Sequence, residues 1–126
     1  MRFLPTSVHG VIDYVAGIVI LVLPWIFDWE DSAKVIMTIL GLGVILYSLL
    51  TDYELGVARV IPMPTHLLLD ALGGIVLIVA PFIFGIDDTT TRTVMIILGI
   101  LEVGASLITQ TTPSRTRRTD QAGRTV

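Results

Sequence analysis

Four long stretches without a charged residue constrain this chain more than any other feature of its sequence. They are Tyr14 to Phe27, Val35 to Thr51, Ala71 to Ile86 and Thr93 to Leu101. With their weakly polar flanks, each reaches about 17 to 21 residues, enough for a helix to cross the hydrocarbon core of a bilayer. Only 15% of the 126 residues are charged, against roughly 25% in an ordinary soluble domain. The sequence therefore predicts an integral membrane protein.

The second half of the chain repeats the first. A shift of 57 positions aligns His9 with His66 and Asp13 with Asp70. The same shift aligns Gly17 with Gly74, Pro24 with Pro81, Phe27 with Phe84 and Asp31 with Asp88. After one inserted residue, a shift of 58 aligns Met37 with Met95, Gly41 with Gly99, Ser48 with Ser106 and Thr51 with Thr109. Matches in register across two helices and a turn indicate a duplicated helical hairpin.

The predicted fold is all-α, an integral membrane four-helix bundle built from two tandem repeats of a transmembrane hairpin. We expect helices over residues 7–28, 34–51, 65–85 and 92–110. Ser7 and Thr65 are placed to cap the first and third helices, and Pro62 and Pro64 prevent a helix from running through the central connection. A single membrane domain then covers residues 1–110, with repeats at 7–52 and 64–110 and an interfacial connection at 52–64. Residues 111–126 have little to bury, so we expect a disordered basic tail.

Basic residues predict the orientation of the bundle. Those on the side of the two termini are Arg2, Arg59, Arg115, Arg117, Arg118 and Arg124. Only Lys34 and Arg92 lie on the opposite side, among several acidic residues. Because cytoplasmic segments are enriched in lysine and arginine, we expect both termini in the cytoplasm and a multi-pass protein of the plasma membrane.

Four short motifs resemble the SPW repeat family of small bacterial and archaeal membrane proteins. The motifs are PWIF at 24–27, PFIF at 81–84, HGVIDY at 9–14 and LLTDYELG at 49–56. The resemblance covers residues 5–110. Where the family has Ser-Pro-Trp, this chain has Leu23-Pro24-Trp25 and Ala80-Pro81-Phe82. The resemblance implies a four-helix membrane fold with two repeats, and it implies no activity.

The proline-aromatic pairs of this repeat signature lie near the end of the first helix of each repeat. Pro24 and Pro81 each remove one amide donor and can bend the last turn. Trp25 and Phe82 then fall at the level of the outer headgroups, where amphipathic rings settle. We interpret each pair as a kink with an interfacial anchor. The alternative is a broken helix that lines a binding site, as in some transporters.

Two stripes of polar and small residues recur in both repeats. On the first helix of each repeat, the spacing i, i+4, i+8 places three residues on one face: His9, Asp13 and Gly17, then His66, Asp70 and Gly74. On the second helix, the spacing i, i+3, i+7 does the same: Gly41, Val44 and Ser48, then Gly99, Glu102 and Ser106. Small residues let membrane helices approach closely. We therefore expect these faces to pack together, with their polar groups pointing into the bundle.

The depth of the polar residues in the membrane favours the same arrangement. At about 1.5 Å rise per residue, Asp13 and Asp70 lie roughly 7 to 9 Å inside the cytoplasmic helix ends, and Glu102 roughly 12 Å. A polar belt in the cytoplasmic half of the bundle can hold His9, Asp13, Ser48, His66, Asp70, Glu102 and Ser106.

Three roles are open for this belt. In the structural one, each aspartate accepts hydrogen bonds from its own histidine or from the other repeat, because unpaired polar groups in lipid cost several kcal/mol. In the second, Asp13, Asp70 and Glu102 titrate in a proton- or ion-coupled permeation unit tuned by the two histidines. A metal site made of His9, Asp13, His66 and Asp70 is chemically possible. Since i, i+4 histidine–aspartate pairs are commoner as simple hydrogen bonds, no metal is assigned.

Other chemistry finds little support in the sequence. There is no P-loop, dinucleotide fingerprint or nucleophile elbow, and the absence of cysteine excludes a thiolate site. The RTRR run at 115–118 more simply meets anionic headgroups than nucleic acid. We expect no enzyme and no cofactor. The predicted function is that of a structural or partner-binding membrane component, with the lipid bilayer and a second copy or another membrane protein as partners; the alternative is proton- or ion-coupled permeation.

Overall fold

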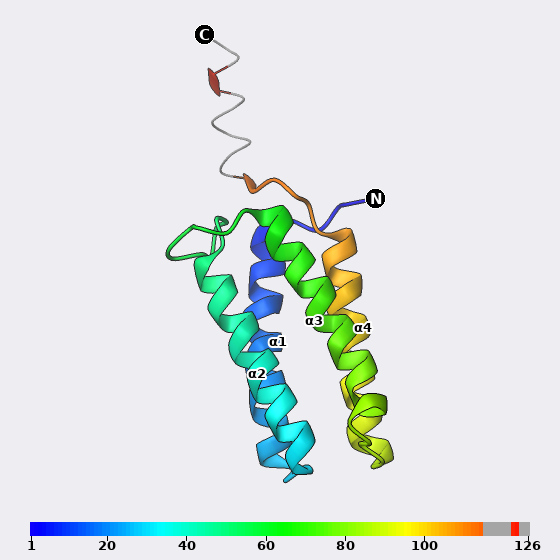
Figure 1. The fold of residues 1–126 in the computed structure, drawn as a ribbon. Helices are drawn as coiled ribbons and strands as arrows, with labels where there is room; N and C mark the ends of the chain where they lie inside the picture. Colours follow the sequence, from blue (N-terminus) through cyan, green and yellow to red (C-terminus); the bar gives the residue numbers. More distant parts are fainter. Residues whose placement is uncertain (115–121, 124–126) are drawn as a thin grey trace.

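The computed structural model describes residues 1–114 and 122–123. Its membrane domain consists of four helices: α1 (Thr6–Ile26), α2 (Asp31–Leu50), α3 (Met63–Ile83) and α4 (Thr89–Ile108) (Figure 1). Each of them is long and apolar enough to cross a membrane. In the described part of the chain, extended pairing is limited to isolated bridges. The predicted all-α, four-helix membrane fold is therefore confirmed.

The helices of each repeat begin earlier than predicted. α1 follows Pro5 and α3 follows Pro62, and neither start has a side-chain cap. The prediction that Ser7 and Thr65 are N-caps is thus wrong: both lie inside the first turn. The proline that precedes each helix has extended backbone angles, which set the helix start directly after it. Pro64 also belongs to α3, in the first turn, where a missing N–H leaves no hydrogen bond unmade.

Each repeat forms one tightly packed hairpin, α1 with α2 and α3 with α4. The tightest approach in the second hairpin joins Gly74 and Gly99, since a Cβ added to Gly99 would lie 2.4 Å from the carbonyl oxygen of Gly74. Gly17 and Gly41 do the same in the first hairpin, where a Cβ on Gly41 would lie 2.9 Å from the Gly17 oxygen. The expectation that the small-residue stripes are packing faces is confirmed.

The two hairpins lie side by side, with the start of α1 and the end of α4 at the same end (Figure 1). Contacts between the hairpins run mainly along the seam between α2 and α3. One apolar cluster fills the end away from the termini, around Ile20, Met37, Leu77 and Met95. Around the bundle, apolar side chains such as Ile18, Ile39, Ile75 and Ile97 are exposed, as suits helices that face lipid.

The segments that precede α1 and α3 pair with residues that follow α4 and α2 at the same end of the bundle. Leu4 pairs with Thr109 at the end of α4, and Ile61 pairs with Thr51 at the end of α2. The connection between the hairpins folds back over α2, where the amide of Asp52 donates to the carbonyl of Ile61 at 2.8 Å. These pairings fix the start of α1 against the end of α4, and the start of α3 against the end of α2. The interfacial position of this connection stays a prediction.

The aromatic ring of each proline-aromatic pair lies near a cation in both repeats. Trp25 and Phe82 are exposed. The ammonium of Lys34 lies 5.5 Å from the centre of the Trp25 ring, and the guanidinium of Arg92 lies 5.5 Å from that of Phe82. Each cation comes from the partner helix of the same hairpin, so the pair ties the two helices together at the turn.

Candidate functional site

Four buried side chains converge between α1 and α3. His9 and Asp13 come from α1, His66 and Asp70 come from α3, and each of the four is at most 1% exposed. His9 Nε2 lies 2.8 Å from Asp70 Oδ2, and His66 Nε2 lies 2.8 Å from Asp13 Oδ2. The distances within one helix are longer, 3.1 Å and 3.2 Å. In this His–Asp tetrad, the shortest pairs therefore cross from one repeat to the other.

Two threonines at the ends of α2 and α4 orient the imidazole rings. Thr51 Oγ1 lies 2.6 Å from the carbonyl oxygen of Tyr47 and 2.7 Å from His66 Nδ1. A hydroxyl has one proton, and a carbonyl only accepts, so Thr51 donates to the carbonyl and accepts from Nδ1–H. Thr109 repeats the arrangement, with its own i−4 carbonyl at 2.6 Å and His9 Nδ1 at 2.8 Å. Both rings thus carry a proton on Nδ1 and turn Nε2 towards the carboxylates.

In each crossed contact, a lone pair of a histidine Nε2 faces a carboxylate oxygen. An unprotonated Nε2 and a carboxylate oxygen are both acceptors, so each 2.8 Å contact requires a proton between its two atoms. Two protons, one for each crossed pair, make the tetrad neutral as a whole. A buried set of charges that is both paired and hydrogen-bonded avoids the cost of an isolated ion.

The tetrad is not fully symmetric. The hydroxyl of Tyr47 donates to Asp70 Oδ1 at 2.5 Å, while the equivalent position of the second repeat is Ala105. The rings of Tyr47 and Tyr53 also lie 5.1 Å and 5.4 Å from that of His66. Asp70 and His66 are therefore held by more side chains than their counterparts in the first repeat.

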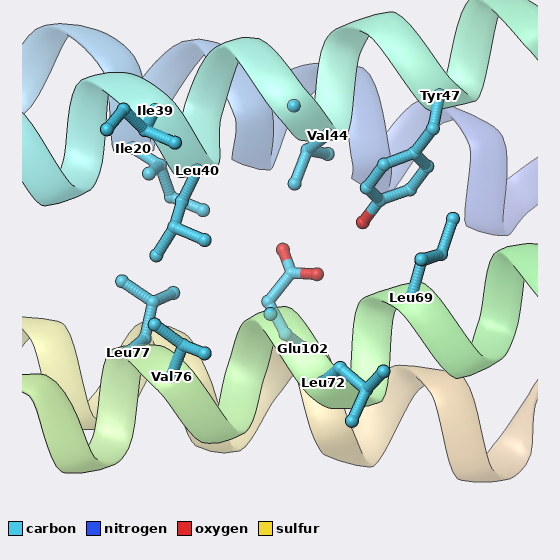
Figure 2. Close-up of a pocket in the computed structure, with 12 residues that line it drawn as sticks. Ile20, Ile39, Leu40, Val44, Tyr47, Leu69, Leu72, Val76, Leu77 and Glu102 are labelled. Carbon is cyan, nitrogen blue, oxygen red and sulfur yellow. The ribbon is translucent and has the colours of Figure 1, made fainter.

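Glu102 on α4 is 7% exposed and makes no hydrogen bond or ion pair with any residue that the structure describes. Its carboxylate points into a cavity of about 310 Å³ between α2 and α3 (Figure 2). Apart from Glu102 and Tyr47, the cavity walls are apolar. Gly43 and Gly73 line it, and a Cβ added to either would meet nothing within 4 Å. Tyr47 lies between this cavity and the tetrad, since its hydroxyl reaches Asp70.

The structure divides the predicted polar belt into separate parts. His9, Asp13, His66 and Asp70 come together in the tetrad. Ser106 Oγ instead donates to the carbonyl of Val103 within its own helix, at 2.7 Å. Ser48 Oγ is buried without a hydrogen bond to the described residues, and Glu102 faces the cavity.

Sequence reasoning missed three residues of the site. Thr51 and Thr109 occupy equivalent positions of the two repeats. This match could have identified them, because a threonine at the same helix end in both repeats indicates a shared role. Tyr47 has no equivalent in the second repeat and carried no such signal. The predicted tail, with its arginines at 115–118, falls largely outside the described residues.

Comparison with known proteins gives one match. The family model described as the SPW repeat domain matches residues 7–109. No curated protein and no solved structure matches the chain. The matched segment covers all four helices except Thr6, the first residue of α1, and contains every member of the tetrad.

Proposed function

The chain belongs to the SPW repeat family, and we propose that it is a structural or partner-binding component of the plasma membrane whose two hairpins are held together by the His–Asp tetrad. The observation that carries this proposal is the crossing of the pairs: both 2.8 Å contacts join a histidine of one repeat to an aspartate of the other. The tetrad is buried and hydrogen-bonded, as a structural link requires. We assign the protein no catalytic reaction; its partner is a second copy or another membrane protein.

A flux measurement separates this role from conduction. The full-length protein is reconstituted into liposomes, and proton flux is compared with that of empty liposomes. A structural tetrad gives no flux above the empty control, and the paired Asp13→Asn, Asp70→Asn variant unfolds more readily in detergent. Flux that is present in the wild type and lost in this variant contradicts the structural role.

A second function, proton- or ion-coupled permeation, is favoured by one observation. Glu102 is a buried carboxylate without a partner among the described residues, and it faces a cavity at the seam between the hairpins. Ionisable groups within the membrane are costly and commonly mark an ion pathway. The matched variant is Glu102→Gln, which keeps the shape of the side chain. Under this second function, wild-type liposomes conduct and Glu102→Gln liposomes do not.

The proposed orientation places both termini in the cytoplasm. Arg2 and Arg59 lie at that end, whereas Lys34 and Arg92 at the other end each pair with an aspartate, at 2.5 Å and 3.2 Å. Because the chain has no cysteine, single cysteines report on sidedness. In intact cells, a membrane-impermeant maleimide should label Thr90→Cys and should label Thr111→Cys only after permeabilisation. The reverse pattern contradicts this orientation.

A further inference from the structure

We propose that the His–Asp tetrad binds one divalent transition-metal ion of the zinc class, through Nε2 of His9 and His66 and one carboxylate oxygen each of Asp13 and Asp70. Each of these residues offers one ligand atom, and the four atoms all lie within 4.8 Å of one another. Two imidazoles and two carboxylates form a donor set that zinc accepts in tetrahedral sites. This inference goes beyond the structural link, which the hydrogen-bonded tetrad supplies by itself.

The distances around the tetrad suit a single ion. His9 Nε2 lies 2.8 Å from Asp70 Oδ2 and 3.1 Å from Asp13 Oδ1. His66 Nε2 lies 2.8 Å from the other Asp13 oxygen, Oδ2, and 3.2 Å from Asp70 Oδ2. With zinc–nitrogen and zinc–oxygen bonds of about 2.0 to 2.2 Å, ligand atoms around one tetrahedral ion lie roughly 3.3 to 3.6 Å apart. To admit a tetrahedral ion, the closest ligand atoms need to separate by about half an ångström. The more distant pairs, which lie within 4.8 Å, need to approach.

The residues around the tetrad have the arrangement that supports metal ligands. A metal-binding histidine ordinarily donates its other ring N–H to an oxygen, which fixes the tautomer and the direction of the ring. Thr51 and Thr109 accept these protons from His66 and His9, at 2.7 Å and 2.8 Å. Tyr47 likewise donates to the Asp70 oxygen that does not face the histidines. These three are positioning residues, since none of them touches the ion.

The charge of the site selects a divalent ion. With neutral imidazoles and ionised carboxylates, the four ligands carry two negative charges in a buried place. One divalent ion balances these charges, as do the two protons of the hydrogen-bonded tetrad. On binding, the ion enters and these two protons leave, so the net charge of the site is unchanged. Mixed imidazole and carboxylate donors favour zinc and its neighbours over calcium or magnesium, which prefer oxygen ligands alone.

The test uses the full-length protein in detergent, purified without a polyhistidine tag and stripped with a chelator. Zn²⁺ is titrated against a chromophoric chelator, and Co²⁺ is added separately to record its visible absorption. We expect one Zn²⁺ per chain and the intense absorption of four-coordinate Co²⁺. His66→Ala should lose both signals, and Glu102→Gln, a matched buried change outside the ligand set, should keep them.

The positioning residues supply a second measurement. Thr51→Val should weaken Zn²⁺ binding by about 10- to 100-fold, and Thr51→Ser, which keeps the hydroxyl, should restore it. The proposal is overturned if stripped wild-type protein binds no Zn²⁺, if His66→Ala binds it equally well, or if Co²⁺ shows the weak absorption of a six-coordinate ion. If ligand variants fail to fold, the wild-type Co²⁺ spectrum alone decides. None of these failures affects the structural role, which is read from the stability of the metal-free protein.

Discussion

Replacing Glu102 by valine should make the protein more stable. Valine is the residue at the equivalent position of the first repeat, Val44, so the helix accepts it there. The substitution removes a carboxylate that is 7% exposed and has no hydrogen bond or ion pair among the described residues. An unsatisfied buried polar group costs about 1 to 3 kcal/mol, more when it is charged.

The expected gain can be set against the loss of packing. Glu102 already faces a cavity of about 310 Å³, so the shorter valine gives up few contacts with neighbouring atoms. We expect a net rise of about 1 to 2 kcal/mol in the free energy of unfolding. Glu102→Gln should gain less, because the amide is still polar. A stabilising effect of Glu102→Val would show that folding does not need this carboxylate.

The assay is equilibrium unfolding in mixed micelles, followed by circular dichroism. Val44→Glu is the matched control, since Val44 lines the same cavity. It adds a second buried carboxylate there and should lower the free energy of unfolding by about 1 to 3 kcal/mol. If Glu102→Val unfolds more readily than the wild type, the reasoning is refuted, and Glu102 stabilises the protein through a partner.

Two further predictions concern packing and pH. Gly99→Ala should destabilise the protein by about 1 to 3 kcal/mol, because its Cβ would lie 2.4 Å from the carbonyl oxygen of Gly74. Gly104→Ala is the control and should be neutral or stabilising, because its Cβ would meet nothing within 4 Å. Thermal unfolding compares the two variants. Burial raises the pKa of Glu54, but hydrogen bonds from Ser114, Thr6 and nearby amides outweigh it and hold the pKa below its ordinary value. A carboxylate with a lowered folded-state pKa stabilises above its unfolded pKa, and this is lost as pH falls through the folded value. Glu54→Gln should therefore flatten the pH dependence of stability below about pH 4.3. Near pH 9 the slope should be unchanged, and the variant should be less stable than the wild type by the contribution of the carboxylate.

Much of the fold follows from sequence periodicity. The four apolar stretches and the match between the repeats predict the helices, and the stripes through Gly41 and Gly99 predict how each hairpin packs. The helix starts were less predictable, because Ser7 and Thr65 are good capping residues by type. Proline at the preceding positions, through its fixed backbone angle, began both helices earlier.

The details of the site depend on how the hairpins meet. The i, i+4 spacing of His9 and Asp13 is equally compatible with a pair inside one helix and with crossed pairs. The distance between α1 and α3 decides between these arrangements, and no local pattern encodes it. The cavity likewise depends on Gly43 and Gly73 lining the same seam, although they belong to different repeats and have no special spacing.

The measurement that tests the central claim most directly compares two double variants with the same chemical change. His9→Leu, Asp70→Leu removes one crossed pair and leaves the other, Asp13 with His66 at 2.8 Å. His9→Leu, Asp13→Leu leaves a histidine and an aspartate within α3 alone, at 3.2 Å. Breaking one member of a buried pair costs about 3 to 5 kcal/mol, so each single variant should be strongly destabilised.

Equilibrium unfolding of the metal-free variants then gives the coupling energy of each pair. If the tetrad links the hairpins, the crossed double variant should be more stable than either of its single variants and more stable than the same-helix double variant. This holds even though the crossed variant also removes the acceptor of Tyr47. Equal stability of the two double variants, or losses in the crossed pair that simply add, would contradict the link between the repeats.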